Sequence, residues 1–407
     1  MTQPAVPSAP SATDAGLRME LSPLQEAARA AFAAYVDEHV APHAGGWDRA
    51  ASTPREAIRR LAATGWLGAV LPAAQGGAGM DWVTFGLLNE ELGRGCSSLR
   101  SLLTVHSMAS HAVLRFGSRV QKERWLPRLA CGEAIGAFAL SEPGVGSDAS
   151  AVETTAVQDG DEWVLHGRKK WITYGQIADV FLLFAKTEGK PIAFLVECGA
   201  PGLTVQPLRG ITGTRASMLA ELRLDGCRLA ADARLGGAGF GLGIAVATLE
   251  VGRYSVACGT AGIARACLDA SLAYAAERVQ YGVPIGEHQL VQQMLARMAA
   301  GWRAAHWLCL RAGWLRDQND PSAAHETFVA KYLASTAATQ AALDAVQVHG
   351  ANGCSEDFPV ERYLRDSRVM EIIEGSTQIQ EVTIARGELA AAHPPRPLFS
   401  RTAGDGG

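Results

Sequence analysis

Apolar and polar positions in the first third of the chain recur with the spacing of amphipathic helices. Ser22-Pro23-Leu24-Gln25 combines a cap hydroxyl, a first-turn proline and a glutamine at the third helical position, which together predict a helix start. Thr53-Pro54-Arg55-Glu56 repeats this pattern, and Gly65 is a stop signal. We therefore expect an N-terminal helical domain over residues 21–136. The apolar residues that share one face of the first helix are Leu24, Ala28, Ala31 and Tyr35.

The pattern changes at about Ala137 to short runs of β-branched and aromatic residues that are separated by Gly and Asp. Residues 219–224 alternate before a further turn that is predicted at Asp225-Gly226. We expect a central antiparallel β domain over residues 137–235. The predicted hairpins join 154–157 to 163–165 through Asp159-Gly160-Asp161, and 181–185 to 192–196 through Glu188-Gly189-Lys190.

Helical spacing returns after Gly243 in long Ala-rich segments that continue to about Ala392. These segments predict a C-terminal four-helix-bundle domain over residues 236–392, and the chain is therefore an α+β multidomain protein. Residues 1–20 are rich in Ala, Pro and Ser, and residues 393–407 are rich in Pro and Gly. We expect both ends to be disordered tails.

Composition narrows the classes of function. The 407 residues carry a formal charge of −4, which gives no electrostatic reason to bind nucleic acid. Eight scattered cysteines without a CxxC pair, and histidines without zinc-like spacing, argue against a disulfide framework and a metal site, and fit a cytoplasmic protein. The apolar stretch 240–249 is shorter than the roughly 20 residues of a membrane helix, so we expect no membrane span.

Two stretches of the β domain are candidate ligand contacts. The loop 139–148 packs two glycines, a proline and hydroxyls together, and it could offer bare backbone N–H groups to a flat or anionic ligand. An ordinary surface turn has the same composition. Trp171 and Thr173 follow the first hairpin, where a buried core tryptophan is the commoner outcome. The glycines around Phe240 superficially suggest a dinucleotide loop, but no βαβ unit surrounds them.

Glu374 is the candidate general base. It lies between Ile372-Ile373 and a helix start that is predicted at Thr377, with Gln380 as the capping-box partner. An acid in such apolar sequence is partly desolvated, which raises its pKa toward the range of a general base. The alternative is a carboxylate that only stabilises the helix terminus.

Taken in order, these strings resemble the acyl-CoA dehydrogenase family from roughly Leu21 to Ala391. The loop 138–148 is similar to one family signature. Four further strings follow the order of the other signature, and the family's helical, β and helical domains match the expectation above. These strings are Gln347-Val348-His349-Gly350, Pro359-Val360-Glu361-Arg362, Arg365-Asp366 and Glu374-Gly375-Ser376.

The resemblance implies an FAD-dependent dehydrogenase of acyl thioesters. Glu374 matches the base that takes the α-proton while the β-hydride passes to the flavin. A minority of the family carries the base at the position of Gly252 instead, where glycine cannot serve. The implied substrate contacts are Ser147, Arg253 and Gly375. The implied FAD contacts are Phe138, Leu140, Ser141, Gly146, Ser147, Trp171, Thr173, Ser376 and Gln378, with Arg278, Gln280, Gln289, Gln347 and Gly350 reaching the FAD of a neighbouring subunit.

The resemblance also implies a homotetramer or homodimer, with an electron-transfer flavoprotein as a partner. Gly350-Ala351, Ile373 and Ser376 stand where the family usually has Gly-Gly, an aromatic residue and Thr. The strings 369–376 and 252–257 look like a subgroup of polyketide pathways that acts on acyl groups bound to a carrier protein. The expected substrate is a short acyl group on CoA or on an acyl carrier protein. Two alternatives are a flavin-dependent oxidase or monooxygenase of the same fold, and a non-catalytic paralogue that binds a carrier protein.

Overall fold

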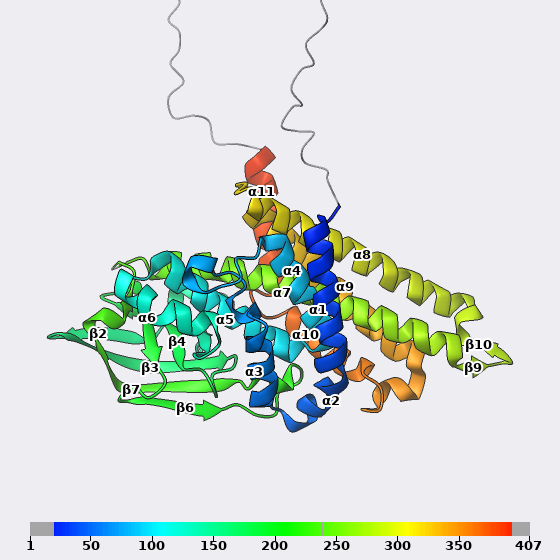
Figure 1. Cartoon of the computed structure of the whole chain (residues 1–407), viewed down its shortest axis with the longest axis horizontal. Coiled ribbons are helices and arrows are strands. Elements are labelled where there is room, and N and C mark those ends of the chain that lie inside the picture. The colour runs from blue at the N-terminus through cyan, green and yellow to red at the C-terminus, as the bar shows by residue number, and fades with distance from the viewer. Residues whose placement is uncertain (1–19, 238, 393–407) are drawn as a thin grey trace, which may run out of the picture.

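The computed structural model describes residues 20–237 and 239–392, and it places a β sheet beside two sets of helices (Figure 1). The order of helices, then strands, then helices confirms the predicted fold class. The tails that were predicted at 1–20 and 393–407 fall outside the described residues, apart from Glu20.

Of the two helix starts predicted in the N-terminal domain, the structure contains the cap at Ser22 but not the one at Thr53. Ser22 and Gln25 form the predicted capping box, but the first helix buries Phe32 and Val36, whereas Leu24 is 84% exposed. The third helix has Pro54 at its N-cap position and no side-chain cap, and the Thr53 hydroxyl instead makes hydrogen bonds with the Tyr174 hydroxyl and the Ala216 carbonyl. The helices are α1 (Pro23–His39), α2 (Ala41–Ala50), α3 (Arg55–Ala63), α4 (Trp82–Gly95), α5 (Ser97–Phe116) and α6 (Arg119–Ala130), with short 3-10 turns η2 (Trp66–Gly68) and η3 (Ala73–Gln75).

The central sheet contains both predicted hairpins. Its strands are β1 (Gly136–Ala139), β2 (Thr155–Asp159), β3 (Glu162–Ile172), β4 (Val180–Thr187), β5 (Lys190–Glu197), β6 (Leu203–Pro207), β7 (Ala220–Ala230) and β8 (Arg234–Leu235), in the order β6-β7-β3-β2-β4-β5-β8 with β1 on β4. The sheet is mainly antiparallel, but β1 and β2 pair with β4 in parallel.

The turn predicted at Asp225-Gly226 is wrong. These residues lie inside β7, where the register with β3 shifts and Gly226 has φ +61°. The extra residues form a bulge, which is why their turn-like composition does not end the strand.

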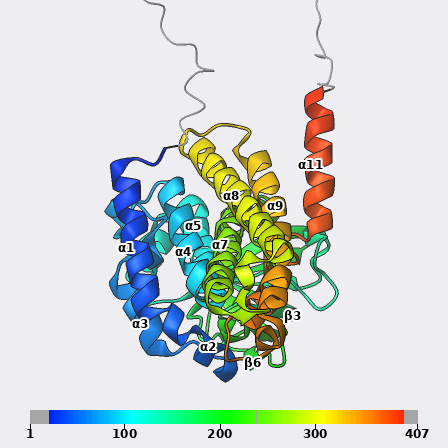
Figure 2. The same cartoon turned by 90° about the vertical axis from the view of Figure 1, so that its right-hand side faces the viewer.

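The C-terminal helices pack around one long central helix, α7 (Gly241–Glu277). The other helices are α8 (Gln289–Asp317), α9 (Ala323–His349), α10 (Val360–Met370) and α11 (Thr377–Ala392), and β9 (Val279–Gln280) pairs with β10 (Val283–Pro284) at the far end of the bundle. The helix α11 projects from the body, and only residues of its first turn, Thr377 and Gln380, are buried (Figure 2).

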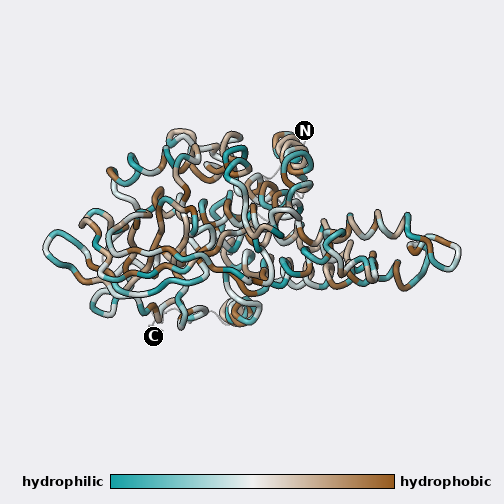
Figure 3. Tube along the Cα trace, turned by 90° about the horizontal axis from the view of Figure 1, so that it is seen from below, coloured by the Kyte–Doolittle hydropathy of each residue, from teal (hydrophilic) through white to brown (hydrophobic). Residues whose placement is uncertain are grey.

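The helix α7 is long and apolar enough to cross a membrane by length and composition. The expectation from sequence considered only the apolar stretch 240–249 and did not indicate a helix of this length. Its most apolar window is 72% buried, because α4, α5, α8 and α9 pack around it. It is a core helix of the bundle. Figure 3 shows that hydrophobic segments also run along other strands and helices inside the protein.

Phe138 on β1 and Leu249 on α7 pack against both the helical core and the core that α5, α6 and the start of α7 form with the sheet. The end of β1 and the first half of α7 therefore border the same two cores, and the candidate site is built around them.

Candidate active site

A buried ion pair holds the loop that follows β1. Lys169 Nζ lies 2.6 Å from Glu142 Oε1 and donates to the Leu140 carbonyl. Glu142 also accepts from the hydroxyl and N–H of Thr154 and from the N–H of Glu153. Burial lowers the pKa of Lys169 to about 8, and although burial alone would raise the pKa of Glu142, Lys169 and these donors hold it below its usual value. The loop is therefore fixed at its base by charge.

The far side of this loop is open. Gly146 and Ser147 are exposed, and none of the described residues accepts a hydrogen bond from their backbone N–H groups. Leu140 is buried, and Ser141 is half-buried with its carbonyl accepting from the N–H of Lys170. The loop thus has the free donors that its composition suggests.

Trp171 is not a core residue, and the interpretation of it as a buried core tryptophan is wrong. Its φ of +65° lies in a register shift at the end of β3, and its side chain is 52% exposed. A bulge re-aims a side chain in this way. Thr173 is half-buried beyond it, and Phe138 is half-buried with its ring 5.3 Å from Phe184.

Glu374 lies in the short segment between α10 and α11. Both Glu374 and Gly375 have positive φ, +54° and +93°, a conformation that is strained for glutamate. The helix cap predicted at Thr377 is wrong, because the Ser376 hydroxyl accepts from the N–H of Ile379 at 3.4 Å while Thr377 bonds to the carbonyl of Glu371. Glu374 therefore precedes the cap and does not belong to the helix.

Three side chains hold the carbonyl groups of this segment. Arg253 Nε donates to the Glu374 carbonyl at 3.3 Å, and Lys331 Nζ donates to the Gly375 carbonyl at 2.7 Å. Gln380 Nε2 donates to both carbonyls, at 3.1 and 2.9 Å. The N–H of Glu374 has no acceptor among residues 20–237 and 239–392. The segment is thus held in its strained conformation with one donor free.

The Glu374 carboxyl is desolvated. Its Oε2 atom is buried and has no hydrogen-bond partner in the described part of the chain. Burial raises the pKa of Glu374 to about 7, although Arg253, Lys331 and Arg100 favour the ionised form. The expectation of a raised pKa is confirmed, and its cause is desolvation.

Lys331, Gln380 and Arg100 were not among the candidates from sequence. Burial lowers the pKa of Lys331 to about 8 and that of Arg100 to about 10. Lys331 stands on a face of α9 that otherwise carries small residues, and Arg100 stands among buried Ser, Leu and Thr residues of α5. A lone cation on an otherwise uncharged helix face is the signal that could have found both.

The remaining expected cofactor contacts do not meet this site within one chain. They lie at the far end of the bundle, around the β9–β10 hairpin and the end of α9 (Figure 1). Glu277 ends α7 25 residues after Gly252, which is about 38 Å at the rise of a helix. The exposed residues of this group are Arg278, Gln280, Gln289, Gln347 and Gly350.

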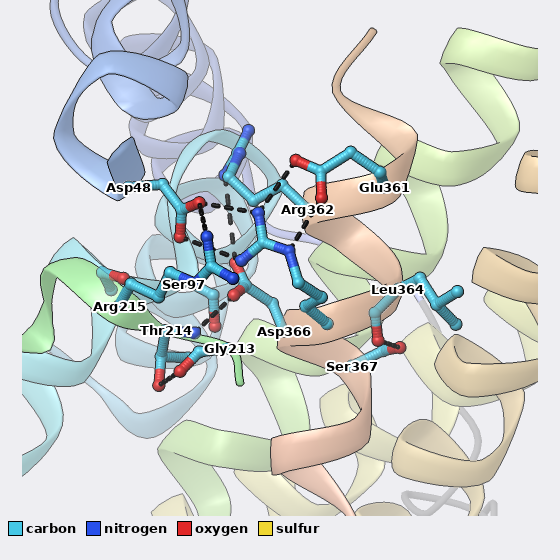
Figure 4. Close-up of polar contacts among 12 residues, drawn as sticks. Asp48, Ser97, Gly213, Thr214, Arg215, Glu361, Arg362, Leu364, Asp366 and Ser367 are labelled. Carbon is cyan, nitrogen blue, oxygen red and sulfur yellow. Dashed lines mark hydrogen bonds and ion pairs between the residues drawn. The ribbon is translucent and has the colours of Figure 1, made fainter. Parts of the chain in front are cut away.

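A charged network positions α10, the helix that leads to Glu374 (Figure 4). Arg365 Nη2 lies 2.6 Å from Asp48 on α2, and Arg365 also binds Glu361. Asp366 accepts from the N–H of Thr214, in the loop before η5 (Arg215–Ser217). The string Arg365-Asp366 therefore joins α2, the β domain and α10. Within residues 20–237 and 239–392, no group of three or more His, Cys, Asp or Glu side chains could hold a metal ion.

Comparison with known proteins gives matches over nearly the whole chain. Three family models match in order: the acyl-CoA dehydrogenase N-terminal domain at residues 22–133, its middle domain at 137–227 and its C-terminal domain at 239–389. The chain is 38% identical to the human mitochondrial short-chain specific acyl-CoA dehydrogenase over 357 residues, which is 86% of each protein.

Two solved structures are also similar. A glutaryl-CoA dehydrogenase from Mycobacterium smegmatis in complex with FADH2 has 32% identity and a TM-score of 0.87, and covers 91% of this chain and 95% of its own. FkbI, described as acting in biosynthesis of the methoxymalonyl extender unit of the Fk520 polyketide, has 35% identity and a TM-score of 0.81, and covers 89% of this chain and 99% of its own.

Proposed function

The chain belongs to the acyl-CoA dehydrogenase family of FAD-dependent oxidoreductases, and we propose that it oxidises a short acyl thioester with Glu374 as the base. The observation that carries this proposal is the environment of one carboxyl group. A general base works best when its pKa is near the working pH, and burial raises the pKa of Glu374 to about 7.

The proton that must be removed is only weakly acidic, so the negative charge that develops on the thioester carbonyl oxygen needs a donor. The free N–H of Glu374 supports that role, since it belongs to the same residue as the base. Arg253, Lys331 and Gln380 would keep this backbone in place during the reaction by holding the carbonyl groups of the segment. One strained residue would thus supply both the base and the donor.

Bound FAD supplies the hydride acceptor. The residues present fit a flat, partly anionic group, because an exposed indole stands beside a loop with unused N–H groups. Trp171 would give a surface for the ring, and the loop would give hydrogen bonds. We propose that the residues that hold it are Phe138, Leu140, Ser141, Gly146, Ser147, Trp171 and Thr173, with Ser376 and Gln378 at the start of α11, and that Ser147, Arg253 and Gly375 border the thioester.

The distance between Glu374 and the expected cofactor contacts at the far end of the bundle supports an oligomer. The residues around the β9–β10 hairpin are exposed and about 38 Å along α7 from Gly252, so in this proposal they contact the FAD of a neighbouring subunit. Val279, Tyr281 and Leu290 are exposed apolar residues in the same region, and a partner surface would cover them. A homotetramer or a homodimer satisfies this arrangement.

Similarity to FkbI, a protein named for a methoxymalonyl extender unit, agrees with the polyketide subgroup that the sequence resembles, and that subgroup acts on acyl groups bound to a carrier protein. Similarity to the short-chain acyl-CoA dehydrogenase supports CoA as the handle. Both agree on a short acyl group.

A panel of short acyl groups on CoA and on an acyl carrier protein tests the proposed function. Each thioester is added without oxygen to the purified, FAD-loaded protein, and the flavin absorbance is followed. At least one thioester is expected to bleach the flavin, and no bleaching by any of them would contradict the proposal. Reoxidation by an electron-transfer flavoprotein but not by dioxygen would then identify a dehydrogenase rather than an oxidase.

A further inference from the structure

The loop between β6 and β7 lies directly against the backbone of α10. A Cβ at Gly213 would overlap the carbonyl of Arg365 and lie 2.8 Å from the backbone nitrogen of Asp366, so a side chain there could not fit unless the loop or the helix moved. Thr214, the next residue, donates its N–H to Asp366 Oδ1 at 2.5 Å (Figure 4). Two consecutive residues thus fix the loop on the helix.

Asp366 is the buried carboxylate of this contact. It is 2% exposed, and burial raises its pKa to about 6, although Arg362 and the N–H of Thr214 favour the ionised form. Burying a carboxylate is unfavourable unless its partners compensate. A hydrogen bond from an N–H to a charged acceptor is strong and sets a geometry. Asp366 therefore fixes where α10 lies relative to the loop.

The same loop, residues 212–218, also holds the segment that carries the expected flavin contacts Trp171 and Thr173. The Ser217 carbonyl accepts from the N–H of Tyr174 at 2.8 Å. The Ser217 hydroxyl lies 2.9 Å from the hydroxyl of Ser101 on α5, which fixes this end of the loop to the helical core. The loop therefore binds the flavin-contact segment at one end and α10 at the other.

The helix α10 leads directly to the base. Glu374 follows Asp366 by eight residues, and the N–H of Ile373 bonds to the carbonyl of Val369 in the last turn of the helix. A Cβ at Gly252 would be 2.7 Å from Glu374 Oε2, so the carboxyl has little room. A displacement of α10 would therefore move the base.

Backbone strain marks the three segments that the loop joins. Nine non-glycine residues in the described part of the chain have positive φ, and five of them lie in these segments: Trp171, Tyr174, Thr214, Met218 and Glu374. Such conformations persist only where the surrounding contacts determine them, and they concentrate at functional sites. The contacts of the loop and of α10 supply that constraint.

We propose that Asp366 is a positioning residue that, through the 212–218 loop, sets the distance between the base Glu374 and the flavin-contact segment 171–174. This inference rests on the proposed function and deepens it, because a base and a hydride acceptor must stand at a fixed distance on either side of one substrate bond. Asp366 is buried away from the substrate, so its loss should slow the reaction without weakening thioester binding.

Flavin reduction without oxygen, by the best thioester of the panel, tests this inference. Asp366→Ala removes the acceptor and should lower the limiting rate constant about 100-fold, the effect of a misplacement of about 1 Å. Asp366→Asn keeps an oxygen for the N–H of Thr214 and should stay within about 10-fold of the wild type. The apparent dissociation constant of the thioester, taken from the concentration dependence of the rate, should not change in either variant.

Gly213→Ala reaches the same contact from the loop without removing a polar group. Its Cβ should push the loop away from α10 and slow reduction by a similar factor. Combining it with Asp366→Ala should add little, because both changes break one contact. Gly46→Ala is the matched control on α2, since a Cβ there meets nothing within 4 Å, and it should react at the wild-type rate.

Amide hydrogen exchange, followed by mass spectrometry, reports the coupling without turnover. Peptides that cover residues 171–176 and 371–376 should exchange faster in both Asp366→Ala and Gly213→Ala, and should be unchanged in Gly46→Ala. If no thioester reduces the wild-type flavin, faster exchange in both peptides would still support the coupling while the proposed function fails.

Retained FAD and a cooperative melting transition show that the variants are folded. If Asp366→Ala does not fold, Gly213→Ala still decides, since it keeps every polar group of the contact. Wild-type rates in the folded variants, a loss that appears in thioester affinity instead of the rate constant, or faster exchange confined to α10 and the loop would each overturn the inference.

Discussion

The carboxyl of Glu374 lies directly against the backbone of Gly252. A Cβ at position 252 would be 2.7 Å from Glu374 Oε2 and 2.7 Å from the sulfur of Met108. Gly252 lies in the middle of α7, where glycine costs up to about 1 kcal/mol relative to alanine. The missing side chain leaves room for the acid, and the position that carries the base in a minority of the family is thus adjacent to Glu374.

Gly252→Ala should displace the carboxyl and lower kcat roughly 100-fold, because a misplacement of about 1 Å can cost that much. Overpacking should also destabilise the fold by about 1–3 kcal/mol. Gly243→Ala is the matched control on the same helix, since a Cβ there meets nothing within 4 Å. It should keep full activity and gain about 0.5–1 kcal/mol. Equal activity of the two variants would contradict the close contact.

The buried pair of Glu142 and Lys169 should be needed for both stability and FAD retention. Glu142→Gln leaves a buried lysine without its partner and should cost about 3–5 kcal/mol of unfolding free energy. The loop 139–148 should loosen, so that FAD is lost on gel filtration. Adding Lys169→Met should restore part of the stability, as followed by denaturant unfolding. If Glu142→Gln alone were as stable as the wild type, the pair would not anchor the loop.

Lys331 should set the pH at which the base works. Its attraction lowers the pKa of Glu374, so Lys331→Met should raise that pKa and move the rising limb of the rate profile to higher pH. Loss of the hydrogen bond to the Gly375 carbonyl should also lower the maximal rate about 10-fold. Lys190→Met, at the exposed first residue of β5, should leave the profile in place. A shift to lower pH would reverse the assigned charge effect.

Glu374 should destabilise the fold above neutral pH. Its pKa is raised from 4.5 to about 7 in the folded protein, so the folded state holds its proton more tightly and stability falls as pH rises between these values. Glu374→Gln mimics the protonated acid. Scanning calorimetry should show the variant to be more stable by about 2–3 kcal/mol near pH 8.5, with little difference near pH 4.5. An equal difference at both pH values would exclude this titration as the cause.

Local patterns were sufficient for much of the fold. The capping box at Ser22 and both hairpins depend on residues a few positions apart, and the structure contains them. Thr53 fails as a cap because its hydroxyl binds Tyr174, which is 121 residues away in sequence. The parallel pairing of β1 with β4 is likewise set by distant partners.

The candidate site shows the same division. Glu374 is found from its apolar neighbours and from the family resemblance, and its raised pKa follows from burial. The contacts of Lys331, Arg253 and Gln380 with the same segment depend on how α7, α9 and α11 pack. No pattern along the chain specifies that packing, and so these contacts were not predicted.

The most direct test of the central claim is the rate of flavin reduction, without oxygen, by wild type and by Glu374→Gln with the best thioester of the panel. Wild-type kcat/KM should rise with pH through about pH 7 and then level off, as expected of a base with that pKa. Glu374→Gln should be slower by roughly 10²–10⁴-fold while retaining FAD. Equal rates for the two proteins would show that Glu374 is not the base.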